Sequence, residues 1–201
     1  AVGSFTINGF NVNSVLHPET DANNSITAPV VIEVTNNTYA RDNGVKDGLF
    51  RDVNKAAYEI GNWFQIWEPA ATMGLDVFVE STTSTGAAIF ATIRDGERTL
   101  VAQSQEYIVK ATDKNKFITL KFDEFIDLDG ESFYFAGVGT QGGVGTRDLV
   151  VGTAGYSPDQ SSVLYRNAED TWYFTNNTPM VRFNFDQTLG LDQVENSVVE
   201  F

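Results

Sequence analysis

The residues best suited to chemistry in this sequence are aromatic side chains that stand in or beside loops. Their rings offer flat apolar faces with polar edges, which suit stacking on sugar rings or contacts with another protein. In an extended segment Trp63 and Trp67 share one face, opposite Phe64 and Ile66. The alternative is that these rings pack in the core, as we expect for most of the phenylalanines. The candidate ligand-binding residues are Trp63, Trp67, Trp172, Tyr173, Tyr156 and Tyr165.

Three acidic residues alternate around one Asp-Gly pair, namely Asp127, Asp129 and Glu131. Oxygen ligands at this spacing suit calcium, which is a hard cation. The EF-hand pattern is not met, because its third ligand position and its closing glutamate are missing. The segment therefore predicts either a structural calcium site or a solvated acidic turn between two strands.

The residue inventory excludes several kinds of catalytic site. The chain has no cysteine and one histidine, His17, so zinc sites built on cysteine, thiol catalysis and disulfide scaffolds are excluded. A Ser-His-Asp triad would depend on His17, which stands in a loop-like context that favours a surface role. The glycines at 137, 139 and 142 match a dinucleotide fingerprint, but more glycine follows where that fingerprint requires a helix. We therefore interpret them as part of a glycine-rich loop.

Hydrolysis of glycans by two carboxylates remains an alternative function. Such enzymes need a pair of acids separated by about 5–9.5 Å, and some of the 27 acidic residues will satisfy that distance by chance. No short motif marks one pair above the others, so the sequence favours a protein that is not an enzyme.

Length and charge narrow the class of protein further. The chain has 201 residues, the size of one domain, and a formal charge of −14. There is no surplus of lysine and arginine to neutralise phosphates, which argues against binding nucleic acid or anionic lipid. No apolar run reaches the length of a membrane span, so we expect no membrane insertion. Abundant Asn, Thr and Gly without cysteine favour an extracellular or cell-surface protein.

Short strands separated by turn residues dominate the sequence. Alternating or apolar runs occur at 30–34, 75–80, 87–94, 98–104, 116–122, 132–139, 149–151 and 181–185, and nothing sustains a helical period. Asn8-Gly9 and Asp95-Gly96 are typical hairpin turns, and Asp129-Gly130 separates two further strands. The segment 52–60 fits either a short helix or an extended loop. This pattern predicts an all-β fold, specifically an antiparallel β-sandwich of jelly-roll type.

Several segments carry a resemblance to a known group of proteins. They are AYEIGNWF (57–64), LDVFV (75–79), LVAQSQEY (100–107), YFAGV (134–138) and TPMVRFNF (178–185). Together they resemble β-sandwich modules of secreted Bacteroidetes surface proteins, which precede a C-terminal sorting domain of the type IX secretion system. The resemblance covers residues 50–201 and supplies no active-site residues. It implies export and a non-catalytic role within a longer protein.

We therefore expect a single sandwich domain over 1–186, with 1–50 as an extension that contributes strands. Residues 187–201 resemble the linker toward a sorting domain that is absent from this sequence. The expected function is adhesion or ligand binding outside the cell, with a polysaccharide or another surface protein as the partner and no cofactor apart from the calcium considered above. A purely structural spacer is the main alternative.

Overall fold

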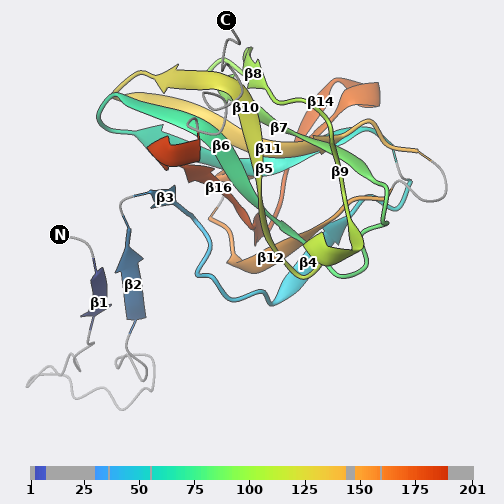
Figure 1. Ribbon diagram of the computed structural model, residues 1–201, viewed down its shortest axis with the longest axis horizontal. Coiled ribbons are helices and arrows are strands. Elements are labelled where there is room, and N and C mark those ends of the chain that lie inside the picture. Colours follow the sequence, from blue (N-terminus) through green and yellow to red (C-terminus); the bar gives the residue numbers. More distant parts are fainter. Residues whose placement is uncertain are drawn as a thin grey trace, which may run out of the picture. The chain divides into compact units, whose positions relative to one another are not determined.

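The computed structural model describes residues 3–7, 30–35, 37–54, 56–143, 148–158 and 160–189 (Figure 1). The chain divides into two compact units, Ala1–Asn36 and Asn37–Phe201. In the first unit, β1 (Gly3–Ile7) pairs antiparallel with β2 (Val30–Val34). The second unit holds all the other strands, including β3 and β4 from the N-terminal 50 residues. The proposed hairpin at Asn8-Gly9, His17 and the tail from 190 onward lie outside the described residues.

The second unit consists of two antiparallel sheets, each with seven strands. The first sheet contains β3 (Thr38–Tyr39), β4 (Gly48–Arg51), β6 (Ala70–Val79), β10 (Lys116–Leu128), β12 (Val150–Tyr156), β15 (Asn177–Pro179) and β16 (Val181–Asn184). The second contains β5 (Tyr58–Ile66), β7 (Ala88–Asp95), β8 (Leu100–Gln103), β9 (Tyr107–Ile108), β11 (Ser132–Thr140), β13 (Ser162–Arg166) and β14 (Thr171–Phe174).

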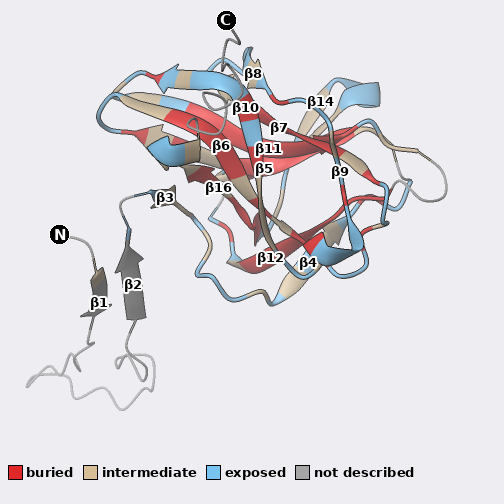
Figure 2. Ribbon diagram, in the orientation of Figure 1, coloured by how far each residue is buried: buried red, intermediate tan, exposed pale blue. Residues whose placement is uncertain are grey.

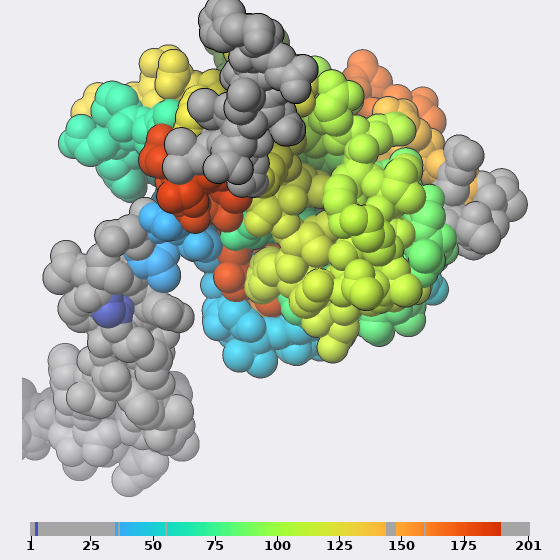
Figure 3. Space-filling model, viewed as in Figure 1, coloured from blue at the N-terminus to red at the C-terminus, as the bar shows by residue number. Residues whose placement is uncertain are grey.

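The strand order is that of a jelly roll, which confirms the predicted fold class. The first sheet contains the order β4-β12-β6-β10, and the second contains β5-β11-β7-β8. Consecutive strands from β4 to β7 and from β10 to β13 alternate between the two sheets. The chain therefore crosses from one sheet to the other at each of these steps, and the two sheets pack face to face around the core. The β8 to β10 segment, in yellow-green, forms much of the near surface in Figure 3.

The described residues contain no α-helix; their helical elements are the 3₁₀ turns η2 (Ala111–Asp113), η3 (Asn167–Glu169) and a further one at 187–189. For the segment 52–60, the sequence allowed either a short helix or an extended loop. In the structure, a turn at 53–54 leads into β5, which begins at Tyr58. No helix of these residues combines the length and apolar character that a membrane crossing needs.

The core lies between the two sheets and follows the two-residue period of the strands. On β5, Phe64 and Ile66 are buried in it, as are Leu75 and Val77 on β6 (Figure 2). A buried amide also links the sheets: Asn62 of β5 donates hydrogen bonds to the carbonyls of Pro179 (2.8 Å) and Val181 (3.0 Å). Its own carbonyl accepts a hydrogen bond from the hydroxyl of Ser162 (2.7 Å), so both ends of the amide are satisfied inside the core.

Two turns depart from the simplest reading of their Asp-Gly pairs. Asp95-Gly96 does join the hairpin β7–β8, but the left-handed residue is Arg98, with φ 71°, and not the glycine. The Asp95 carboxylate accepts hydrogen bonds from the amides of Glu97 and Thr99, which stabilises this longer turn. Asp129-Gly130 joins β10 to β11, which belong to different sheets, so it is a crossover between layers and not a hairpin turn.

The close pairing of β5 and β11 leaves no room for a side chain at Gly61. A Cβ atom there would collide with the main chain of Ala136 and Gly137, which cannot move as a side chain can. Gly61→Ala should therefore lower the free energy of unfolding by about 3 kcal/mol in urea titrations. Gly96→Ala is the control, because a Cβ there meets only ordinary contacts with Phe133, and it should change stability by less than about 1 kcal/mol. Equal effects of the two substitutions would contradict this account.

The turn after β6 depends on an ionised carboxylate. Burial raises the pKa of Glu80, but hydrogen bonds from Thr82 and Ser81 and the charge of Lys46 outweigh burial and bring it from 4.5 to about 2. Because the pKa of Glu80 is lower in the folded than in the unfolded state, its ionised carboxylate stabilises the fold. This stabilisation is present above about pH 4.5 and is lost as the pH falls toward 2. We expect Glu80→Gln to flatten the pH dependence of unfolding free energy between pH 5 and pH 3. The exposed-carboxylate control Glu68→Gln should keep the wild-type slope, and equal slopes for all three proteins would refute the assignment.

Candidate functional site

The candidate site lies on the outer face of the second sheet, away from the core. Because Phe64 and Ile66 of β5 point inward, the alternate residues Glu59, Trp63 and Gln65 lie on the opposite face. The prediction that Trp63 lies opposite Phe64 and Ile66 is therefore confirmed, and the structure shows that its face is the outer one. Glu59 is nevertheless only 2% exposed, so a further layer of side chains covers part of this outer face.

Glycines of β11 make room for that layer. The ring of Phe135 lies against Gly137, and the ring of Phe90 lies against Gly139; a Cβ atom at either glycine would collide with the ring. These glycines belong to the strand itself, and not to a loop as the sequence had indicated. They leave a strip of bare backbone on the outer face of the sheet.

Across this strip, Glu59 of β5 forms a buried ion pair with Arg94 of β7. The guanidinium of Arg94 donates from Nε to Oε2 of Glu59 (2.9 Å) and from Nη2 to Oε1 (2.7 Å). The hydroxyl of Thr92 donates a third hydrogen bond to Oε2 (3.1 Å). These hydrogen bonds with Glu59 raise the pKa of Arg94 although burial of the guanidinium opposes this, so the arginine stays charged.

The guanidinium of Arg94 in turn supports a group of aromatic rings. It lies over Tyr165 of β13 at 5.2 Å and over Trp172 of β14 at 5.9 Å from the ring centroids. Tyr165 and Trp172 stack at 4.8 Å, and Trp172 meets Phe135 edge-on at 5.2 Å. Trp63 completes the cluster, 5.8 Å from Phe135 and 6.3 Å from Trp172. The Trp63 indole is therefore held by a ring from the neighbouring strand β11 and by a ring from β14, which lies beyond β13.

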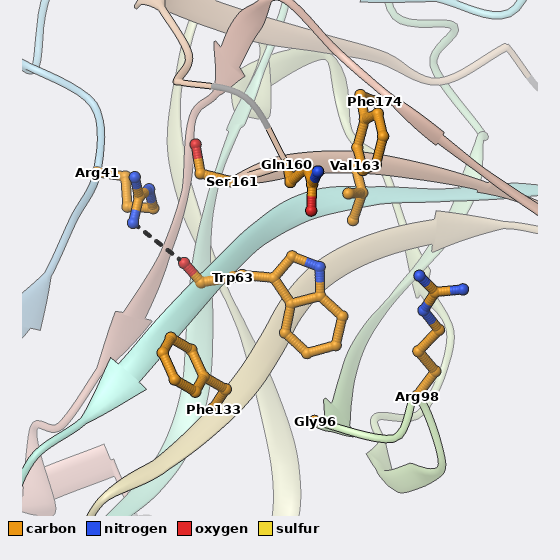
Figure 4. A pocket seen from close by; sticks show the side chains of 9 residues that line it. All are labelled: Arg41, Trp63, Gly96, Arg98, Phe133, Gln160, Ser161, Val163 and Phe174. Carbon is orange, nitrogen blue, oxygen red and sulfur yellow. Dashed lines mark hydrogen bonds between the residues drawn. The ribbon is translucent and has the colours of Figure 1, made fainter.

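Beside this cluster lies an open groove of about 410 Å³, within the range typical of small-ligand sites (Figure 4). Trp63 lies in the middle of the lining side chains, with Phe133 on one side and Arg98 on the other. Phe133 and Phe174 are 51% and 59% exposed, so both present apolar surface to solvent. The described residues that line it are Arg41, Trp63, Gly96, Arg98, Phe133, Gln160, Ser161, Val163 and Phe174. None of these described residues is acidic.

The structure brings three of the six predicted aromatic residues together. Trp63 lines the groove, and Trp172 and Tyr165 support it from behind. The other three lie outside the groove lining. Trp67 follows the end of β5 and is 65% exposed, Tyr156 ends β12 in the first sheet, and Tyr173 donates a hydrogen bond from its hydroxyl to Glu169 (2.5 Å).

Sequence reasoning missed most of the groove lining. Phe133 and Phe174 are exposed, whereas the sequence favoured a core position for most phenylalanines and did not single out these two as candidates for binding. The alternation of side chains along a strand could have identified both residues. Phe133 is next to the buried Tyr134 and so lies on the opposite face, and Phe174 is two residues from the outward Trp172 and so lies on the same face. Arg41, Arg98 and Gln160 come from three separate loops, and no local pattern connects them.

Of the acids predicted to hold calcium, Asp127 lies near the end of β10, and Asp129 and Glu131 lie in the crossover from β10 to β11. Asp127, Asp129 and Glu131 are all exposed, and Glu131 is in the left-handed region with φ 58°. Within the described ranges, no three or more acidic or histidine side chains form a group able to hold a metal ion. The calcium site stays a prediction, without a ligand cluster to support it.

Removing one partner of the Glu59–Arg94 pair should destabilise the protein strongly. Glu59→Leu or Arg94→Met leaves the other charge buried, at an expected cost of about 3–5 kcal/mol in unfolding free energy. The double variant should lose less than the sum of the single losses, because no uncompensated charge remains. Glu169→Gln, in the exposed pair with Arg166, is the control and should cost less than about 1 kcal/mol. Additive single losses would show that the pair is not coupled.

Comparison with known proteins adds no family to this description. No protein-family model matches the chain, and no curated protein matches it either. The function is therefore argued from the groove and its residues.

Proposed function

We propose that this protein is a non-catalytic saccharide-binding module that holds a polysaccharide in the groove on the outer face of its second sheet. The observation that carries the proposal is the set of rings at this groove: Trp63 braced by other aromatics, with exposed Phe133 and Phe174 beside it. The setting that goes with this function is the cell surface or the extracellular space, where polysaccharides are abundant.

The rings suit a pyranose because of its two kinds of surface. One face of a sugar ring carries C–H groups with slight positive charge, and the face of an aromatic ring carries the negative part of its quadrupole. Trp63 has the largest such face in the lining. Its neighbours already fix its orientation, so little side-chain entropy is lost when a ligand binds.

Polar groups around the rings match the hydroxyl rim of a sugar. The guanidinium groups of Arg41 and Arg98 donate hydrogen bonds, and the amide of Gln160 and the hydroxyl of Ser161 both donate and accept them. A groove with apolar rings and a few convergent polar groups is the usual form of a small-ligand site. Because this groove is open to solvent, a ligand need not fit inside it completely.

Alanine substitutions at the exposed rings test this function with little risk to the fold. In a glycan array followed by affinity electrophoresis on the polysaccharides that bind, Phe133→Ala and Phe174→Ala should each weaken binding about tenfold, as expected for the loss of one stacking contact. Trp63→Ala should weaken it further.

Two matched controls are available in the chain. Phe125→Ala removes a phenylalanine that is 41% exposed on β10 of the other sheet, and Trp67→Ala removes an exposed tryptophan outside the groove. Both should bind like the wild-type protein. If no glycan binds, or if the controls lose binding equally, the proposal is wrong; a protein partner or the structural spacer role would then take its place.

A further inference from the structure

We infer that the groove selects acidic polysaccharides, whose sugar rings carry carboxylate groups, and that Arg41 and Arg98 recognise these groups. The inference rests on the proposed function and names the ligand class for the same groove. It comes from the distribution of charge among the described residues, which differs between this groove and the rest of the molecule.

The arginines fall into two groups. Of the six described arginines, four form ion pairs with a carboxylate: Arg51 with Asp148, Arg94 with Glu59, Arg166 with Asp52, and Arg182 with Asp42. The other two are Arg41 and Arg98, which form no ion pair with an acidic side chain in the part of the chain described here. Both line the groove. In a chain with 27 acidic and 13 basic residues, a groove that gathers the two unneutralised arginines is complementary to an anion.

Arg98 is held in place without using its charge on a protein carboxylate. Its guanidinium lies over the Trp172 ring at 5.3 Å, and its main-chain carbonyl accepts a hydrogen bond from Nη1 of Arg94 (3.2 Å). A cation stacked on a ring keeps the N–H groups at its edge available for a ligand. The acids in the same turn do not line the groove: the carboxylate of Asp95 accepts hydrogen bonds from main-chain amides, and Glu97 is exposed.

Arg41 approaches the groove from the segment between β3 and β4. Its Nη1 donates one hydrogen bond to the main-chain carbonyl of Trp63 (3.3 Å), which orients the guanidinium toward the lining residues. In Figure 4, Arg41 and Arg98 lie on opposite sides of the Trp63 indole. A sugar ring stacked on the indole would therefore have a cation beyond each end.

This arrangement fits uronic acid units better than neutral sugars. A uronate carboxylate is attached directly to the ring, so it lies at the rim of a stacked sugar, where guanidinium groups can meet it with paired hydrogen bonds. The net charge of −14 repels a polyanion at long range, but that repulsion is screened beyond about 8 Å at physiological salt. Binding therefore depends on the local arginines.

The test compares polymers that differ only in charge. Polygalacturonate, polymannuronate and polyglucuronate are each paired with their carboxyl-reduced, neutral counterparts, and binding to the 201-residue chain is measured by isothermal titration calorimetry. We expect at least one polyuronate to bind at least tenfold more tightly than its neutral counterpart. Arg41→Gln and Arg98→Gln should each weaken binding to the polyuronate more than binding to its neutral counterpart, and so remove most of that preference.

Lys116→Gln is the matched control, because it removes one exposed positive charge from β10 of the other sheet. It should keep the wild-type preference. Equal binding of a charged polymer and its neutral counterpart, with loss of both in Phe133→Ala, would overturn the acidic preference and leave the saccharide function standing. A preference that survives in the Arg41→Gln/Arg98→Gln double variant, or no binding of any polyuronate, would also overturn the inference. Failure of every glycan in the array would overturn the proposed function as well.

Discussion

The outer face of the second sheet depends on one ion pair, between Glu59 and Arg94, which lie on strands that are not neighbours. The pair spans β11, and it does so only because Gly137 and Gly139 leave no side chain in its path. An ion pair in so buried a place is costly unless its hydrogen bonds are satisfied, and the bidentate geometry together with Thr92 satisfies them. It also places a fixed positive charge beneath the aromatic rings.

The groove is a consequence of that arrangement. The charge of Arg94 attracts the faces of Tyr165 and Trp172, and Trp172 then packs against Phe135 and Trp63. Side chains that would otherwise be mobile at the surface are thereby held in a fixed layer. A preorganised layer of this kind is the physical requirement for binding a weakly interacting ligand such as a sugar, because the cost of ordering the site is met during folding.

Charge is distributed unevenly in this acidic protein. The buried carboxylates of Asp52, Glu59, Glu80 and Asp148 each have a basic partner, which follows from the high cost of burying an unpaired charge. The buried Asp113 instead accepts hydrogen bonds from the Tyr107 hydroxyl and the Lys110 amide. Against that background, Arg41 and Arg98 form no ion pair with an acidic side chain among the described residues, and both line the groove.

The residue pattern predicted the all-β class, the positions of many strands and the placement of Trp63 opposite Phe64 and Ile66, because these follow from a two-residue period and from turn residues that act locally. The jelly-roll type was predicted from strands joined by long loops, and the strand order confirms it. Only the tertiary structure decided which strands become neighbours: β1 pairs with β2, and β10 and β11 enter different sheets although an Asp-Gly turn joins them. It also decided that Arg41, Trp63, Arg98 and Phe174 meet at one groove while Trp67, Tyr156 and Tyr173 lie elsewhere. These contacts join residues that are tens of positions apart in the chain, and their geometry depends on register and packing across the whole sheet, which no local pattern encodes.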